Sequence, residues 1–205
     1  MNNTDKEDSL TLELLAAIDD QSDVTQRHLA DRLGVALGLA NSYLKRCARK
    51  GLIKIQQAPA NRYLYYLTPK GFAEKSRLTA KYLSVSFEFY RKASNSYTAI
   101  FRHCSEDGIA RVALCGISEL AEIATLRAQE FDINVVGCVD FVATKDKFLN
   151  KPVWGALPDN QNIQAVVFTA LNRPELAYKY LSEDIENNKI LVPDFLSFAV
   201  EKNKT

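Results

Sequence analysis

Residues 34–55 read GVALGLANSYLKRCARKGLIKI, a helical pattern followed by a glycine and a β-type run. The pattern predicts an amphipathic helix over residues 36–50, with Gly51 as its stop. Five cationic side chains occur between Lys45 and Lys54, so the outer face of this helix is strongly basic. Its expected inner face comprises Leu37, Ala40, Tyr43, Leu44 and Cys47.

A second helical pattern precedes this stretch, and a hairpin pattern follows it. SDVTQRHLADRLGV has Thr25 as a plausible N-cap and Gly34 as its end. LIKIQQ and RYLYYL, separated by APAN, predict a β-hairpin. Two short helices followed by a hairpin form a winged helix-turn-helix, whose second helix fits the major groove of B-DNA.

The outer surface of this arrangement supplies candidate DNA contacts. Asn41, Ser42 and Arg46 are chemically able to read base edges. The other basic residues of the helix better suit phosphates, as do the hairpin tip and the start of the preceding helix. The predicted DNA-binding residues are Thr25, Gln26, Arg27, Gly38, Leu39, Asn41, Ser42, Lys45, Arg46, Arg49, Lys50, Asn61 and Arg62.

The formal net charge of +1 conceals two blocks of opposite sign. Residues 24–81 carry 12 Lys/Arg and two acids, a net charge of +10. Residues 106–205 carry 10 basic and 15 acidic residues, a net charge of −5. The basic block suits a polyanion such as double-stranded DNA. The alternative to DNA binding is that these basic side chains form an ordinary solvent-exposed face without a partner.

The predicted organisation has two domains joined by helices. TPKG, with Thr68 as the cap and Pro69 in the first turn, begins a helix expected to reach about residue 92, and a shorter helix then leads to Gly108. Apolar residues on two flanks of residues 71–92 predict a homodimer through this helix; the alternative is packing within one chain. The expected segments are a disordered N-terminus (1–8), the winged helix-turn-helix (9–70), linker or dimerisation helices (71–107), an α/β domain (108–200) and a tail (201–205).

The second half alternates apolar runs with helical patterns. ARVALCG, INVVGCVD and QAVVFTA are typical of buried parallel strands, and KILVPDF of a late strand. SELAEIATLRAQEF and RPELAYKYLSEDIENN are typical of crossover helices. The expected fold class is therefore an α+β winged helix-turn-helix domain followed by an α/β domain with a mainly parallel sheet.

RVALCGISELAEIA predicts a strand, a glycine turn and a helix, the place where a doubly wound fold holds phosphate. Of the three glycines in the dinucleotide fingerprint, only one is present, and an acidic residue follows 24 positions later. The predicted ligand-binding residues are Gly116, Ile117, Ser118, Glu119, Asp140, Thr169 and Asn172. The alternative is a dimerisation or protein-contact module without a ligand.

Cysteine and histidine spacing argues against metal and catalytic sites. The cysteines show no CxxC or Cys/His spacing, so no metal is expected. Cys115 and Cys138 fall on neighbouring predicted strands, which leaves a redox role open. His28 and His103 lie outside the candidate pocket, and we expect no catalysis. The polar first residues, and the lack of an apolar run of about 20, favour a cytoplasmic protein that does not contact membranes.

The first half resembles a known family. LADRLGVALGLANSYLKRCARKGLIKI and RYLYYLTPKGFAEKSRLTAKYL are similar to MarR-type winged-helix regulators associated with exopolysaccharide gene clusters, over residues 10–92 or so. The resemblance implies a dimeric transcriptional regulator of polysaccharide genes. Leu39 departs from the pattern, because such regulators often carry a polar or basic residue there; a leucine can still touch a thymine methyl.

INVVGCVDFVATKDKFLNKPVWGALPDNQNIQAVVFTA resembles the small Rossmann-like domain of nucleotide-sugar dehydratases and sugar acyltransferases, over about residues 109–185. The resemblance implies a sensor domain whose ligand is a nucleotide, a nucleotide-sugar or NAD. Two alternatives to a regulator remain: an enzyme acting on nucleotide-sugars with a helical accessory domain, and a protein-interaction module.

Overall fold

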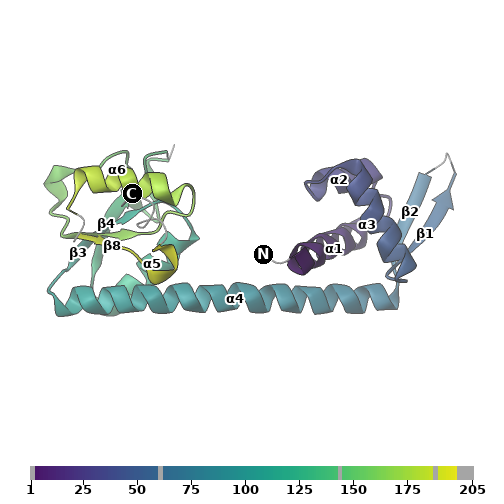
Figure 1. Cartoon of the computed structure of the whole chain (residues 1–205), viewed down its shortest axis with the longest axis horizontal. Helices are drawn as coiled ribbons and strands as arrows, with labels where there is room; N and C mark the ends of the chain where they lie inside the picture. Colours follow the sequence, from purple (N-terminus) through teal and green to yellow (C-terminus); the bar gives the residue numbers. More distant parts are fainter. Residues whose placement is uncertain (1–2, 60–61, 143–144, 187–188, 198–205) are drawn as a thin grey trace. The chain divides into compact units, whose positions relative to one another are not determined.

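The computed structural model describes residues 3–59, 62–142, 145–186 and 189–197 (Figure 1). The chain forms two compact units, residues 1–87 and residues 88–205. The predicted DNA contact Asn61 and the predicted tail, residues 201–205, lie outside the described residues.

The first unit is a winged helix-turn-helix, as predicted. Its elements are α1 (Asn3–Asp20), α2 (Gln26–Arg32), α3 (Leu37–Arg49), β1 (Ile53–Ala58), β2 (Arg62–Leu67) and the first part of α4 (Pro69–Glu106). β1 and β2 pair antiparallel, with Ile53 opposite Leu67. The three short helices and the hairpin enclose one apolar core, in which Leu14, Leu29 and Leu44 are buried.

Local sequence signals explain where these helices begin and end. The Thr25 hydroxyl accepts a hydrogen bond from the backbone N–H of His28 at 3.1 Å, which caps α2. Gly34 follows α2 with φ +61°, in the left-handed region that favours glycine. The Thr68 hydroxyl accepts a bond from the N–H of Gly71 at 3.0 Å and caps α4.

The prediction of a disordered N-terminus is wrong from residue 3 onward. α1 begins at Asn3, and its first turns are fixed by ion pairs to other helices. Lys81 on α4 contacts Asp5 at 3.0 Å and Asp8 at 2.8 Å. Acidic side chains that resemble a solvated tail in the sequence therefore pair with the basic block.

The prediction of two helices between residues 69 and 107 is also wrong. α4 is continuous over 38 residues, because the sequence contains neither glycine nor proline between Gly71 and Gly108. The boundary between the compact units falls within this helix rather than at residue 108. Its second part carries Tyr97 and Phe101, which are fully buried in the core of the α/β unit.

The second unit has a six-stranded sheet in the order β5-β6-β4-β3-β7-β8. All pairings are parallel except that of β5 with β6, so the predicted mainly parallel α/β fold is confirmed. The sheet lies between α6 and the second part of α4 (Figure 1). The elements are β3 (Arg111–Cys115), α5 (Glu119–Ala128), β4 (Asn134–Val139), β5 (Lys147–Phe148), β6 (Lys151–Trp154), β7 (Ala165–Phe168), α6 (Pro174–Asp184) and β8 (Ile190–Leu191), with short 3₁₀ turns at Gln129–Phe131, Asp159–Gln161 and Asp194–Leu196.

Replacing Phe101 by alanine tests the assignment of α4 to the core of the α/β unit. The ring is fully buried, so Phe101→Ala should lower the free energy of unfolding by about 3–5 kcal/mol. Phe72→Ala, at a side chain on the same helix that is 50% exposed, is the matched control and should cost less than about 1 kcal/mol. Urea unfolding followed by circular dichroism measures both; equal losses would contradict the assignment.

Candidate nucleic-acid interface and ligand pocket

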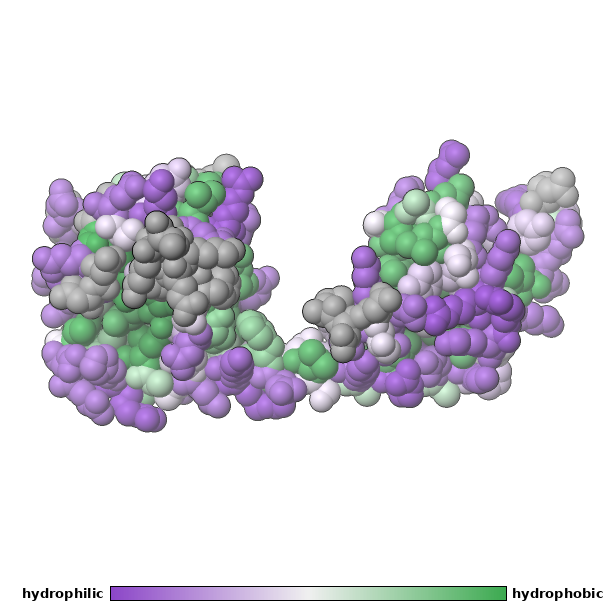
Figure 2. All heavy atoms as spheres, viewed as in Figure 1, coloured by the Kyte–Doolittle hydropathy of each residue, from purple (hydrophilic) through white to green (hydrophobic). Residues whose placement is uncertain are grey.

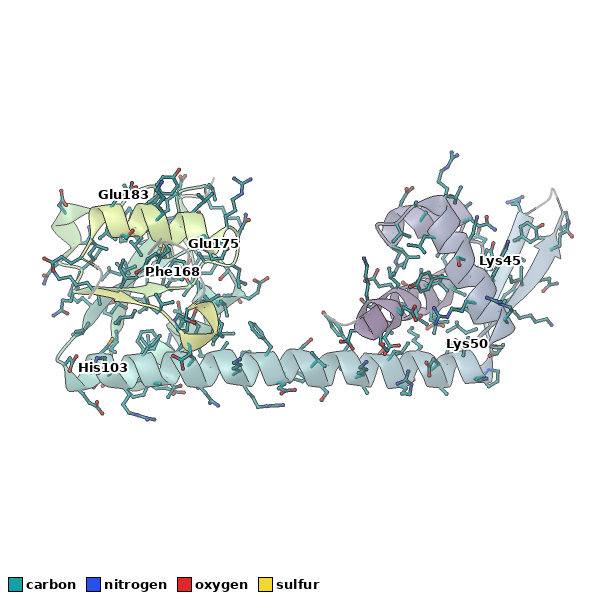
Figure 3. The ribbon with its side chains drawn as sticks, viewed as in Figure 1. Lys45, Lys50, His103, Phe168, Glu175 and Glu183 are labelled. Carbon is teal, nitrogen blue, oxygen red and sulfur yellow. The ribbon has the colours of Figure 1, made fainter. Side chains whose placement is uncertain are left out.

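α3 buries one face and exposes the opposite, basic one. Tyr43, Leu44 and Cys47 are buried, as predicted. Leu37 was expected on the inner face, but its side chain is 45% exposed. It is the first residue of α3 and precedes the turns of the helix that pack against the core. The predicted contacts that are exposed on α3 and directly after it are Gly38, Leu39, Ser42, Lys45, Arg49 and Lys50, two of which are labelled in Figure 3.

Two of the predicted base-reading residues, Arg46 and Asn41, are not free side chains on the outer face of α3. Arg46 donates a hydrogen bond to Glu7 on α1 at 2.7 Å, and the pair lowers the pKa of Glu7 and raises that of Arg46. Asn41 is half-buried, and its side-chain oxygen is buried without a hydrogen-bond partner in the described part of the chain. In this conformation Ser42 is exposed and Asn41 half-buried, whereas the Arg46 side chain is 41% exposed but paired with Glu7.

Of the predicted DNA contacts outside α3, some are exposed and others make hydrogen bonds within the unit. Thr25 and Arg27 are exposed at the start of α2, although the Thr25 hydroxyl caps its own helix. Gln26 donates a hydrogen bond to the hydroxyl of the buried Tyr65 at 3.3 Å, which ties α2 to the hairpin. Arg62 is exposed where β2 begins.

Basic side chains border a shallow depression between α3 and β1. It is lined by Ser42, Lys45, Ala48 and Arg49 from α3 and by Ile55 from β1. Hydrophilic side chains cover much of the visible face of this unit (Figure 2). The ammonium group of Lys45 and the guanidinium group of Arg49 at the edge of this depression are suited to phosphate oxygens.

The α/β unit has a cavity of about 550 Å³ at the carboxyl ends of its central strands. The residues that follow β3, β4 and β7 line it, together with the first turns of α6. Because β4 and β7 lie on opposite sides of β3, this is the point where the chain reverses its direction across the sheet. Open α/β sheets bind ligands at such points.

The structure brings four of the seven predicted ligand residues to this cavity. They are Gly116, Ile117, Asp140 and Asn172. Ser118 caps α5, accepting a hydrogen bond from the N–H of Leu120 at 3.1 Å, and does not line the cavity. Glu119 is an exposed residue of the first turn of α5 and also lies outside the lining.

Thr169 has a structural role and is absent from the lining. It is fully buried, and its hydroxyl donates to the carbonyl oxygen of Gly116 at 2.6 Å. The Ser118 hydroxyl donates to the carbonyl oxygen of Thr169 at 2.6 Å. These bonds join the loop after β7 to the glycine turn, so the ligand prediction for Thr169 is not supported.

Sequence reasoning missed most of the cavity wall. Phe141, Leu171 and Tyr180 line it, as does Arg173, which has a left-handed backbone with φ +48°. Phe141 lies two residues after the end of β4 and Leu171 three residues after the end of β7, where a ligand site in a parallel sheet is expected. Their position after the strand ends could have identified Phe141 and Leu171 as lining residues from the sequence. Tyr180 comes from the middle of α6, where no sequence pattern indicates a ligand site.

All four cysteines are free and buried. Burial raises the pKa of Cys115 and of Cys138 to about 12, so both thiols stay protonated near neutral pH. The nearby Asp140 adds to both shifts. A thiol without thiolate character is a poor redox sensor, which argues against the redox role left open above.

Residues 7–54 match the family model for winged helix-turn-helix DNA-binding domains. Among solved structures, the PcaV transcriptional regulator of Streptomyces coelicolor, in complex with its natural ligand, is similar with 21% identity and a TM-score of 0.36. That match covers 43% of this chain and 60% of PcaV. MepR, a transcription regulator of the Staphylococcus aureus multidrug efflux pump MepA, is similar with 22% identity and a TM-score of 0.36, covering 43% and 63%.

A third similar structure is the O-methyltransferase NcsB1 from neocarzinostatin biosynthesis, in complex with S-adenosyl-L-homocysteine. Its identity is 14% and its TM-score 0.36, with 92% of this chain and 81% of NcsB1 covered. Comparison with curated proteins finds no match. Among the described helices, none combines the length and hydropathy of a membrane span.

Glu7→Gln tests whether Arg46 is held back from DNA by its ion pair. The neutral side chain should release the guanidinium, raising duplex affinity about two- to tenfold and steepening the slope of log K against log salt by about 0.9. Fluorescence anisotropy across salt measures both quantities. Glu130→Gln, which breaks a similar pair with Arg127 in the α/β unit, is the control and should change neither. Unchanged affinity in Glu7→Gln would mean that the pair only anchors α1.

Thiol reactivity tests the buried state of the cysteines. In the native protein at pH 8, a disulfide reagent such as DTNB should react at least about a hundredfold more slowly than in 6 M guanidinium chloride, because burial keeps all four thiols protonated and covered. Absorbance at 412 nm, a wavelength set by the reagent, follows the reaction. Rapid native modification of Cys115 and Cys138 would restore the redox hypothesis.

Proposed function

We propose that this protein is a DNA-binding transcriptional regulator. The observation that carries the proposal is the exposed basic face of α3 within residues that match a DNA-binding winged helix-turn-helix family. α3 enters the major groove, with Ser42 near base edges and Lys45 and Arg49 on phosphates. Arg62, at the start of β2, contacts the adjacent backbone.

The proposed regulator is a homodimer joined through α4. Residues 82–90 are all exposed, and six of the nine are large and apolar. Tyr82, Val85 and Phe87 are 62%, 59% and 57% exposed, which is unusual for side chains on a helix with no other role. A second α4 would cover them. A symmetric dimer would read two half-sites.

The α/β unit is proposed to sense a small metabolite of the nucleotide type in its cavity. A ligand can act on DNA binding only if it binds two arrangements of the dimer with different affinity. The alternative is an α/β unit that only holds the assembly together. We further propose that the chain is a regulator rather than an enzyme and, from the sequence resemblance alone, that its targets are polysaccharide genes.

Duplex binding across salt tests the proposal. Log K should fall steeply with log salt, and Lys45→Ala or Arg49→Ala should each weaken binding about three- to tenfold and reduce the slope by about 0.9. Arg102→Ala, at an exposed position on the second part of α4, is the matched control and should leave both unchanged. Duplex affinity that did not change with salt concentration would contradict the proposed regulator function. Turnover of a nucleotide-sugar by the same sample would then favour the enzyme alternative.

A further inference from the structure

The cavity of the α/β unit has an apolar mouth. Val142, Leu171, Leu176 and Tyr180 line it and are 70%, 44%, 45% and 47% exposed. Large apolar side chains exposed together around a concave site are typical of a surface that a ligand covers. Phe141 packs against the Tyr180 ring, with centroids 5.3 Å apart, and extends this wall inward.

A carboxylate of the protein occupies the place where a phosphate would contact the glycine turn. Asp140 accepts a hydrogen bond from the N–H of Ile117 at 2.9 Å and another from the N–H of Val142 at 3.1 Å. The N–H of Leu120, in the first turn of α5, is likewise taken by the Ser118 hydroxyl. A phosphate at this turn would meet donors already in use and a negative charge.

The single glycine of the turn has a packing role that needs no ligand. A Cβ at Gly116 would lie 2.4 Å from the Cα of Ala170, and φ at Gly116 is +98°. The missing side chain is therefore required by the close approach of the loop after β7. It does not open space for a phosphate, and Gly116→Val would disturb the fold itself.

The charges that line the cavity balance. Asp140 is its acid and Arg173 its base, and they come from the loops after β4 and β7. Each carboxylate oxygen has lone pairs beyond the one used by a backbone N–H, so Asp140 can still accept from a ligand donor. Because its one acidic and its one basic lining residue balance and most of its other lining residues are apolar, the cavity does not favour a ligand with a net charge.

We propose that this cavity binds an uncharged molecule of the nucleoside kind, whose ring packs against the apolar wall and whose hydroxyl or amide group donates a hydrogen bond to Asp140, and that it excludes ligands with a phosphate on the glycine turn. The inference rests on the proposed sensing function of the α/β unit and narrows it from nucleotides to phosphate-free molecules of the nucleoside kind. The cavity volume, about 550 Å³, lies within the usual range for small-molecule sites.

Calorimetric titration of the full chain without DNA tests this proposal. The probes are adenosine and uridine, their 5′-monophosphates, and NADH. At least one nucleoside should bind saturably, its 5′-monophosphate at least about tenfold more weakly because of repulsion by Asp140, and NADH not measurably. Tighter binding of a phosphate-bearing probe would overturn the proposal, and so would the absence of saturable binding by both nucleosides.

Two variants locate the site. Leu171→Ala should weaken nucleoside binding at least about fivefold, whereas Leu126→Ala, an equally exposed leucine on α5 outside the cavity, should leave it unchanged. Asp140→Asn should reduce the discrimination against the 5′-monophosphate; its melting temperature is measured first, because Asp140 also binds two backbone N–H groups. Equal effects of both leucine variants would place binding elsewhere and overturn the assignment.

The outcome is separable from that of the proposed function. Duplex affinity across salt is measured on the same protein, first without ligand and then with saturating nucleoside. If a nucleoside bound but left duplex affinity unchanged, the proposed ligand class of the cavity would be supported and the sensing function of the α/β unit would be contradicted. Salt-dependent duplex binding without nucleoside binding would support the proposed regulator function and would contradict the proposal that the cavity binds a nucleoside.

Discussion

The packing of the apolar stripe of α3 determines what the winged-helix unit presents to solvent. Tyr43, Leu44 and Cys47 are buried against the core that α1 and α2 complete. Because side chains on a helix repeat about every 3.6 residues, burying this stripe turns Lys45 and Arg49 outward. The basic face is therefore a geometric consequence of the core, and substitutions that loosen the core would also misdirect the cations.

Short-range features of this unit could be predicted from the sequence, and long-range ones could not. Caps such as Thr25 depend on residues three positions away, and α3 carries its own periodicity. The position of Arg46 depends on Glu7, which is 39 residues distant and belongs to a stretch with the composition of a disordered tail. A pattern confined to α3 cannot distinguish a free arginine from one that an earlier helix neutralises.

α4 shows how composition can mislead at a larger scale. The sequence predicted a helix end near residue 92, and a domain boundary at Gly108. Helix continuity is decided instead by the absence of breakers and by tertiary packing. Ala93, Tyr97 and Phe101 are buried at helical spacing in the α/β core, which holds this part of α4 in the second unit.

The sequence motif at the glycine turn of the α/β unit is compatible with two structures: a turn that binds a phosphate, and a turn whose hydrogen bonds the protein completes itself. The sequence correctly placed Gly116 and Asp140 beside a cavity, because the carboxyl ends of β3 and β4 are adjacent in a parallel sheet. It could not show that the two residues complete the turn themselves: Gly116 admits the backbone of Ala170, and Asp140 satisfies the N–H of Ile117. A turn that supplies its own anion gains stability without a ligand, and in the proposed site this leaves the contacts with a ligand to the apolar wall formed by side chains from separate loops and α6.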